Sequence, residues 1–463
     1  MIGSFRYKPF RNRYLLTNDS GRYAFLSKEC FQQFIAGAMD PESEIWAMLQ
    51  SRLFCSKESR ETYLQEAIEP VRDNHAYLFS PTSLFIFAVT NQCNNRCVYC
   101  QADGCAAASR MSIDTADKAI DRIREAPSKN LTIEFQGGEP LLNWETIKYV
   151  VKAAKAKLGD KNVNFTIVSN LSLLTEEMVD FIVENKISIS TSLDGPRDLH
   201  DRNRPCADGQ GSYDTMLRGL AMLRARGLEV GAIQTTTKAS LLYAKEIVNE
   251  YAELGFTSVF LRPLTRLGAA SRRWHEIGYT PEEFIQFYQE GISAILDLNR
   301  KGLHFFESHA SIFLSKMLLG YSPNYMELRS PCGATIGQIA FAPNGDVYTC
   351  DEGRMLAEMG DNAFRLGNVE NSGYGDWLDS SVCKAVCSAS LLETLPGCCD
   401  CVYQPYCGVC PIVNYALEGS LISTHPNNDR CRVYRGMLDI LFTYLLEADE
   451  ATLQHLHNWV GNN

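Results

Sequence analysis

Apolar runs of six to eight residues alternate with amphipathic segments between residues 82 and 262. The runs are rich in β-branched and aromatic side chains, which is typical of strands. The predicted strands are 83–90, 131–136, 163–169, 187–193, 229–236 and 257–262. Apolar residues at helical spacing predict helices between them at 113–125, 144–157, 175–185, 213–226 and 240–254. The pattern predicts an α/β fold in which residues 79–265 form a partial (β/α)6 TIM-like barrel, with its chemistry at the C-terminal ends of the strands.

The first 78 residues follow a different pattern. Short β-prone runs at 13–17 and 22–26 flank a turn-rich tetrapeptide, which predicts a hairpin. Ser27 can cap a following helix, and apolar residues within 45–53 predict another. A hairpin followed by short helices resembles the winged-helix modules with which peptide-modifying enzymes recognise their substrates. The alternative is a cap that only covers the edge of the next sheet.

The part of the chain after the barrel divides into two further predicted domains. Residues 266–330 are predicted to form a helical connector with helices at 281–300 and 308–319. Residues 331–463 are predicted to be loop-rich and cysteine-rich, with a final helix near 432–447.

Composition narrows the class of protein. The formal net charge is −11, which argues against nonspecific nucleic-acid binding. We find no apolar run long enough to span a membrane and no secretion signal at the N-terminus, so we expect a cytoplasmic protein without a membrane partner. Cysteine is the outlier, with 17 residues in clusters. In a reducing compartment, such clusters favour metal or iron–sulfur ligation over disulfides.

The loop after the first barrel strand carries Cys93, Cys97 and Cys100 in a C-x3-C-x2-C arrangement. Three thiolates can hold a [4Fe-4S] cluster by three irons and leave the fourth iron open to an added ligand. The same spacing also suits part of a zinc site. With Tyr99 before the last cysteine, the motif resembles that of the radical S-adenosylmethionine (SAM) superfamily. The resemblance implies that the open iron binds SAM and that a 5'-deoxyadenosyl radical is generated.

Segments after later strands strengthen this resemblance. Residues 136–140, which include Gln136, Gly137, Gly138 and Glu139, are similar to the family's GGEP motif, which holds the SAM amino group. Residues 192–204 closely resemble a segment of sulfatase-maturing enzymes, which implies SAM contacts for Ser192 and Arg204. Asn170, at the end of the third predicted strand, is expected to face the ribose, although asparagine at a strand end is usually a turn former.

A second cysteine group resembles the SPASM extension of peptide-modifying radical SAM enzymes. The resemblance implies two auxiliary [4Fe-4S] clusters, one held by Cys332, Cys350 and Cys410, the other by Cys398, Cys401, Cys407 and Cys431. Two residues separate Cys407 from Cys410, where the family has three. A further cysteine that some members have between the positions of Cys332 and Cys350 is absent. The first auxiliary cluster is therefore a ligand short, and either Cys383 or Cys387 completes it or its iron stays open. A zinc ribbon is the structural alternative for the C-x2-C-x5-C-x2-C run.

The resemblance extends over residues 82–431 and implies hydrogen abstraction from a residue of a ribosomally made precursor peptide, followed by an intrapeptide cross-link. Asp351, directly after Cys350, is the implied proton acceptor, and a helix-capping aspartate is the alternative. Phrases at 16–22 and 91–101 resemble the maturases of the His-Xaa-Ser peptide system. A flavodoxin- or ferredoxin-type protein is the expected reductant. Two other functions remain open, a formylglycine-generating sulfatase maturase and an iron–sulfur or zinc regulator whose winged helix binds DNA.

Overall fold

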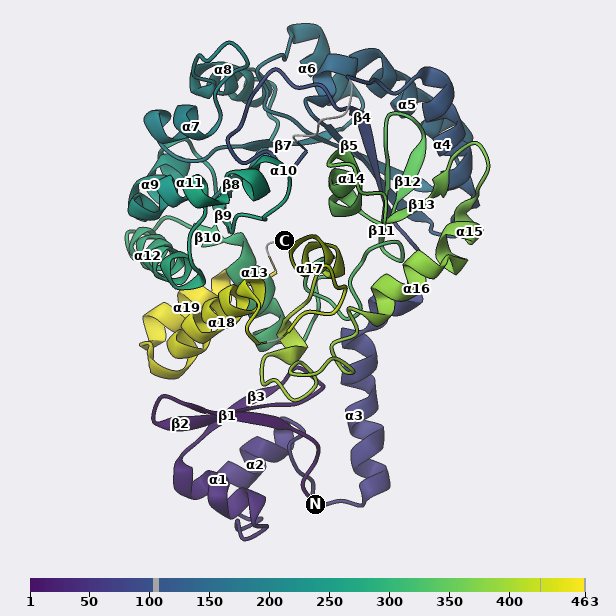
Figure 1. The fold of residues 1–463 in the computed structure, drawn as a ribbon. Helices are drawn as coiled ribbons and strands as arrows, with labels where there is room; N and C mark the ends of the chain where they lie inside the picture. The colour runs from purple at the N-terminus through teal and green to yellow at the C-terminus, as the bar shows by residue number, and fades with distance from the viewer. Residues whose placement is uncertain (103–107, 425, 462–463) are drawn as a thin grey trace.

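The computed structural model describes residues 1–102, 108–424 and 426–461. Its centre is a ten-stranded sheet in the order β10-β9-β8-β7-β6-β5-β4-β11-β12-β13 (Figure 1). The middle six strands are parallel: β4 (Leu84–Thr90), β5 (Asn130–Gly137), β6 (Asn162–Val168), β7 (Ser188–Ser192), β8 (Val230–Thr235) and β9 (Ser258–Arg262). Each of their bounds lies within one residue of a predicted strand, so this α/β part of the fold prediction is confirmed.

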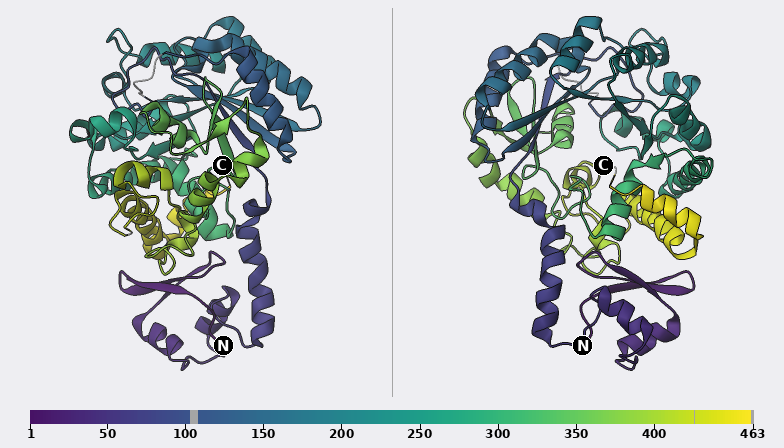
Figure 2. Two further views of the ribbon diagram at one scale, coloured as in Figure 1. Left: turned by 45° about the vertical axis from the view of Figure 1, so that its right-hand side comes forward. Right: turned by 180° about the vertical axis from the view of Figure 1, so that it is seen from behind.

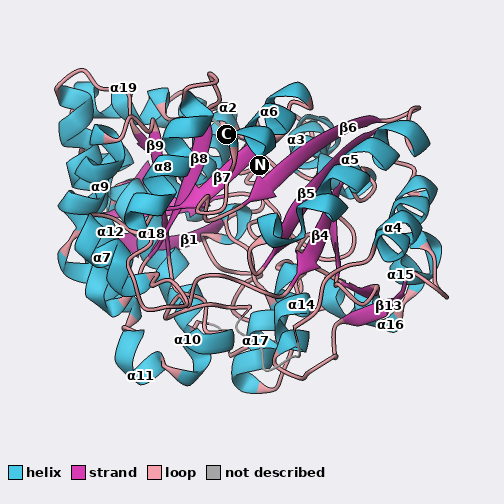
Figure 3. Ribbon diagram, turned by 90° about the horizontal axis from the view of Figure 1, so that it is seen from above, coloured by secondary structure: helices cyan, strands magenta, loops and turns pink. Residues whose placement is uncertain are grey.

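Helices cover the outer side of the curved sheet, as the view from above shows (Figure 3). They are α4 (Ile113–Glu125), α5 (Trp144–Lys157), α6 (Glu176–Glu184), α7 (Arg197–Asn203), α8 (Tyr213–Arg224) and α9 (Ala244–Glu253). The sequence pattern explains α4 directly. Ser112 accepts a hydrogen bond from the Thr115 amide at its N-terminus, and the buried stripe of Ala116, Ala119, Ile120 and Ile123 faces the sheet.

The sheet extends beyond the six predicted strands. β10 (Phe306–Glu307) pairs in parallel with β9, and β11 (Gln338–Phe341) pairs in parallel with β4. β12 (Asp346–Tyr348) and β13 (Arg365–Asn368) then add antiparallel strands. The region after residue 331 was predicted to be loop-rich with one final helix, and its strands were not predicted. These strands have two to four residues, too few to give a readable hydrophobic period.

The N-terminal residues have a sheet and an apolar core of their own. The sheet contains β1 (Arg6–Phe10), β2 (Arg13–Thr17) and β3 (Tyr23–Leu26), and it packs on α1 (Lys28–Ile35) and α2 (Glu44–Ser51). β1 was not predicted, because prolines and charges interrupt its alternation. The rod-like helix α3 (Arg60–Asn74) and the short η1 (Ala76–Phe79) then lead up to the barrel (Figure 2).

The remaining elements fill the space between the sheet ends and the N-terminal residues. They are α10 (Gly268–Arg272), α11 (Trp274–Ile277), α12 (Pro281–Arg300), α13 (Ser308–Leu314), the π-helical η4 (Ser315–Leu319), α14 (Asp351–Glu358), α15 (Tyr374–Asp379), α16 (Ser381–Ser388), η5 (Gln404–Tyr406), α17 (Pro411–Glu418), α18 (Asp429–Glu447) and α19 (Glu450–Asn458). α14 packs on β11, β12 and α17, and α18 packs on α12. α19 follows the helix that was predicted to be the last. Among the described residues, no helix combines the length and apolarity needed to cross a bilayer.

Candidate active site

Cys93, Cys97 and Cys100 line one cavity of about 540 Å³ at the C-terminal end of β4. Gly138 from the loop after β5 and Arg272 from α10 line it as well. Burial raises the pKa of Cys93 to about 11, and it also raises the pKa of Cys97. Thiolates in this setting require a compensating positive charge such as iron. The three thiols and the space beside them suit a cluster together with an added ligand.

The cysteine loop is held by the backbone of the segment that follows α7. The amides of Arg96 and Val98 donate to the carbonyls of Pro205 and Asn203, at 2.7 and 2.9 Å. On the opposite side, the amide of Ala269 donates to the Cys100 carbonyl at 2.8 Å. Backbone bonds to two distant segments therefore fix the loop.

Gly137 and Gly138 let the loop after β5 pass directly against the cysteine loop. A Cβ on Gly137 would lie 2.0 Å from the carbonyl oxygen of Thr90, and one on Gly138 would lie 2.1 Å from that of Gln92. Gly137 also has a φ of +141°, which L side chains rarely adopt. Only glycine fits at these two positions, so the backbone here can approach a ligand in the cavity closely.

Glu139 and Asn170 form a buried polar link behind this loop. Glu139 is 1% exposed, and its carboxylate accepts from the Ser169 hydroxyl at 2.7 Å and from the amides of Asn170 and Leu141 at 2.8 and 3.1 Å. The Asn170 side chain donates to the Oδ1 of Asn94 in the cysteine loop at 2.9 Å. Both side chains therefore join the end of β6 to the loops around the cavity. Gln136 donates to Glu134, two residues earlier on β5.

Arg204 belongs to a second buried network. Its Nη1 donates to the Tyr99 hydroxyl at 2.6 Å, and that hydroxyl donates to the Asp194 carboxylate at 2.8 Å. Burial raises the pKa of Asp194, although the charge of Arg204 acts in the opposite direction. Arg204 also stabilises the charged form of Cys97 electrostatically. The network thus joins the arginine to the cysteine loop, while Ser192 lies at the last position of β7, half-buried.

The C-terminal cysteines gather in two places. Cys332, Cys350 and Cys410 lie in one buried cluster with Leu267 and other apolar residues. Cys398, Cys401, Cys407 and Cys431 line a tight cavity of about 30 Å³, which Cys410 also borders. Cys383 and Cys387, both on α16, form a hydrogen bond with each other. This bond and burial raise the pKa of Cys387, and the charge of Cys332 adds to the effect. Among the described residues, no three His, Cys, Asp or Glu side chains are arranged to hold a single metal ion.

Asp351 occupies the first turn of α14 and is buried. Its carboxylate accepts from Nε of Arg354 at 2.8 Å and pairs with the Nη2 of the same residue at 2.7 Å. Glu134 on β5 is close enough for the charge of Asp351 to add to the effect of burial in raising its pKa. Two carboxylates thus share the space near the C-terminal ends of the strands.

The sequence analysis missed Glu134, although a signal was present. Thr132, Glu134 and Gln136 alternate with buried Leu131, Ile133 and Phe135, so the polar residues share one face of β5. It also missed Glu327, which lies between Arg262 and Arg430, each 2.8 Å away. Burial opposes its ionisation, but the two arginines lower its pKa to about 2. No local pattern connects those three residues.

Comparison with known proteins decides the family. The model for the radical SAM superfamily matches residues 87–243, which include the three-cysteine loop and the segments after β5 and β7. The chain carries a radical SAM domain. Enzymes of this superfamily use a [4Fe-4S] cluster and SAM. A cysteine-type anaerobic sulfatase-maturating enzyme of Clostridium novyi is 23% identical over 338 residues, which are 70% of this radical SAM chain and 86% of the relative.

Two solved structures share the fold of this radical SAM enzyme. Native anSMEcpe with bound AdoMet superposes with a TM-score of 0.69 at 18% identity, covering 82% of this chain and all of the other. Streptococcus suis SuiB bound to precursor peptide SuiA gives a TM-score of 0.57 at 15% identity, covering 92% of this chain and 99% of the other. The predicted partial barrel is therefore the fold of known radical SAM enzymes.

Proposed function

We propose that this radical SAM enzyme abstracts hydrogen from a residue of a ribosomally made peptide and forms a cross-link within that peptide. The observation that carries the proposal is the cavity in which three thiols meet a wide open space. A four-thiol site would saturate a cluster, whereas three thiols leave one iron for an added ligand. When bound there, the cluster and SAM supply the 5'-deoxyadenosyl radical.

The chain's own residues bind and orient the cofactor. Cys93, Cys97 and Cys100 are the proposed iron ligands, and the backbone at Gly137 and Gly138 the proposed contact for the SAM amino group. Glu139 has three protein donors, so we assign it the task of holding the Gly138 loop and the end of β6 in place. The remaining SAM contacts are proposed for Gln136, Asn170, Ser192 and Arg204, by resemblance to the family.

Asp351 remains the proposed proton acceptor for the substrate. Its bond to Arg354 keeps the carboxylate oriented. Glu134 lies near it, and burial together with the charge of Asp351 raises the pKa of Glu134. After hydrogen abstraction, loss of one proton to Asp351 and of one electron to an auxiliary cluster would complete the reaction.

The second cysteine group is proposed to hold two auxiliary [4Fe-4S] clusters. Cys332, Cys350 and Cys410 would hold the first, and Cys398, Cys401, Cys407 and Cys431 the second. The volume enclosed by the latter four thiols is small, which suits a fully ligated cluster without an added ligand. These clusters would exchange electrons with a flavodoxin- or ferredoxin-type reductant, and reduced thiols fit a cytoplasmic location.

The N-terminal residues are proposed to bind the peptide. A cavity of about 830 Å³ lies between residues 1–4 and α3, and its wall exposes Leu64, Ile68 and Phe79 at 46, 48 and 80%. Exposed apolar side chains along a groove are typical of peptide-binding surfaces. The structure described as SuiB bound to precursor peptide SuiA supports a peptide substrate for this fold.

Sulfatase maturation is the second candidate function, favoured by the relative from Clostridium novyi. Its product, formylglycine, carries an aldehyde, which a cross-linked peptide lacks. The exposed groove beside α3 favours the first candidate, because a short sulfatase motif needs no second binding site.

The test is anaerobic reconstitution with iron and sulfide, followed by incubation with SAM, dithionite and the peptide encoded next to the gene. We expect 5'-deoxyadenosine and a peptide lighter by two hydrogens that does not react with a hydrazide probe. A hydrazide-reactive product would favour sulfatase maturation. Absence of 5'-deoxyadenosine from enzyme with intact clusters would refute both functions.

A further inference from the structure

Lys316 is buried without a carboxylate partner. It is 6% exposed and lies on the π-helical turn η4, which ends at Gly320 in the left-handed conformation. Its ammonium donates to the backbone carbonyls of Leu328 and Tyr406. Among the described residues, no carboxylate lies within ion-pairing distance of it. A buried lysine is costly in this state, and desolvation lowers its pKa to about 8.

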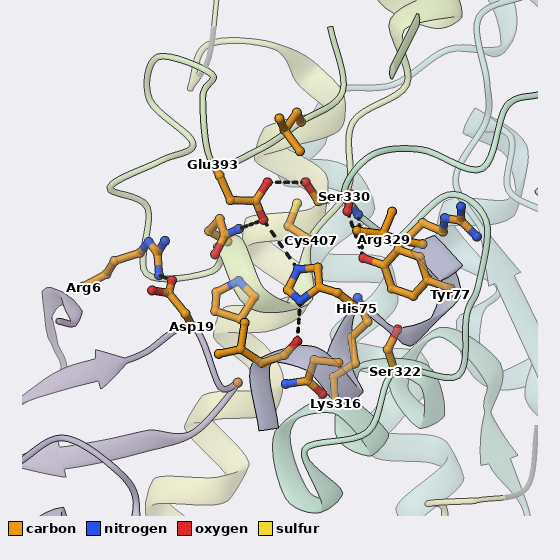
Figure 4. A pocket seen from close by; sticks show the side chains of 17 residues that line it. Arg6, Asp19, His75, Tyr77, Lys316, Ser322, Arg329, Ser330, Glu393 and Cys407 are labelled. Carbon is orange, nitrogen blue, oxygen red and sulfur yellow. Dashed lines mark hydrogen bonds and ion pairs between the residues drawn. The ribbon is translucent and has the colours of Figure 1, made fainter. Parts of the chain in front are cut away.

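Lys316 and Arg329 line the surrounding cavity, and neither cation pairs with a carboxylate of the described residues (Figure 4). This cavity of about 500 Å³ lies where the N-terminal residues meet the body of the protein. The remaining charged groups of the cavity are paired, Arg6 with Asp19 at 2.7 Å and His75 with Glu393 at 3.7 Å. Arg329 stacks on Tyr77 and points away from the centre of the cavity.

The group whose charge acts on Lys316 is Cys407, which would be a thiolate as a ligand of the proposed cluster. Tyr406, whose carbonyl accepts from the lysine at 3.4 Å, directly precedes Cys407, and Cys407 is the group whose charge favours the ammonium form. η4 packs against η5, so the lysine is held at this place by tertiary contacts. Cys407 in turn interacts electrostatically with Cys398, Cys401 and Cys431. The lysine therefore lies beside the four-cysteine site.

We propose that Lys316 is a positioning residue that sets the reduction potential of the cluster held by Cys398, Cys401, Cys407 and Cys431. This inference rests on the second auxiliary cluster of the proposed function. A [4Fe-4S] cluster with four thiolates carries two net negative charges when oxidised and three after accepting one electron from the reductant. A fixed ammonium in a buried setting stabilises the added charge, and no proton has to move.

Lys8 provides a matched comparison. It also lies near this site, since its charge favours the thiolate of Cys401. It differs from Lys316 in that its side chain is 28% exposed and pairs with Asp439 at 3.2 Å. Its charge is therefore compensated and screened by solvent, and its loss should change the potential much less.

The experiment is a redox titration of the full-length reconstituted enzyme, monitored by electron paramagnetic resonance. The signal that is measured is the one that Cys407→Ala removes. Lys316→Gln keeps a donor for the two carbonyls but loses the charge, and Lys316→Met tests the same loss with an apolar side chain. We expect a shift to lower midpoint potential of at least about 59 mV, a tenfold change in the equilibrium for one electron. Lys316→Arg should restore most of it, and Lys8→Gln should give less than a third of the shift.

Two outcomes overturn the inference and are distinguishable. If the signal is present but Lys316→Gln and Lys316→Met have the same midpoint potential as Lys8→Gln, Lys316 does not set the potential. This result would leave the proposed function intact. If Cys407→Ala removes no signal from an iron-loaded enzyme, the four-cysteine cluster itself is refuted, and the inference fails with it.

Discussion

The two cysteine sites of this protein are built from the same side chain but differ in the space they enclose. Three thiols at the end of β4 border a cavity of about 540 Å³, whereas four thiols near η5 enclose about 30 Å³. The first is bordered by glycines and loop backbone, and Arg204 favours its thiolates, whereas the second lies beside Lys316, Lys8 and Arg435, whose charges favour its thiolates.

This difference separates two tasks. An open cavity with a missing ligand admits a second molecule to the cluster, while a closed site with fixed cations stabilises a charge within the protein. In the proposed function, the first site reacts with SAM and the second exchanges electrons. Substitutions at the two sites, and at the cavity beside the second site, test this contrast.

Substitution of Cys97 by alanine should reduce 5'-deoxyadenosine formation to background, because two thiols cannot hold the cluster that binds SAM. The measurement is chromatography of the reaction after dithionite reduction. Cys399→Ala is the matched control, since Cys399 is exposed and outside both proposed ligand sets. Full activity of Cys97→Ala would contradict the assignment of the three-thiol site to the cluster that binds SAM.

Substitution of Cys407 by alanine should affect peptide modification and not SAM cleavage. Cleavage of SAM should persist, while the modified peptide should fall to background, because only the closed site is damaged. Mass spectrometry of the peptide and quantification of 5'-deoxyadenosine in one reaction give both values. Loss of both activities with the first cluster intact would show that the two sites are not separable.

Substitution of Gly138 by alanine tests the open space of the first site. The new Cβ would lie 2.1 Å from the Gln92 carbonyl oxygen, so the loop must shift. A displacement of about 1 Å at a reacting centre can cost about 100-fold in rate, and we expect a loss of that order in SAM cleavage. Gly159→Ala is the control, because its Cβ would come no closer than 3.7 Å to another atom. Equal rates for both variants would contradict the close approach.

The smallest expected effect concerns the ion pair in the cavity beside the second site. Hydrogen bonding to Glu393 raises the pKa of His75 above its usual value of 6.5. The stability that protonated His75 contributes is therefore fully present below pH 6.5 and is lost as pH rises through the raised pKa. Burial alone would raise the pKa of Glu393, but hydrogen bonds from His75 and Ser330 outweigh it and lower the pKa from its usual 4.5 to about 2. The stability that ionised Glu393 contributes is therefore lost only as pH falls from 4.5 towards 2. The pair is therefore strongest between pH 4.5 and 6.5.

Raising the pH from 6 to 8.5 should weaken this pair by less than about 1 kcal/mol, since both groups are partly exposed. Hydrogen exchange in residues 71–79, corrected for the intrinsic rate, should become faster in the wild type. The difference should vanish in His75→Asn. An equal response in that variant would assign the pH dependence to other groups.

Local patterns in the sequence were sufficient for the regular part of the fold. Each predicted barrel strand was within one residue of its observed bounds. The reason is that a short apolar run and the buried strand it forms are the same local segment of the chain. The helix at 113–125 was predicted with its exact ends for a similar reason, since Ser112 and a local apolar stripe define it. The three-cysteine loop was equally readable, because its spacing is confined to eight residues.

Only the tertiary structure decided how distant residues meet. Tyr99 and Arg204 are 105 positions apart, and Lys316 and Tyr406 are 90 apart, so no periodicity connects them. β10 and β11 are too short to be recognised alone and form because the open edges of a parallel sheet offer unpaired backbone groups. The sequence by itself determined which thiols are available and where the strands run. The enclosed volume and the neighbouring charges, which distinguish the two cysteine sites, arise from packing between segments that the chain brings together only when folded.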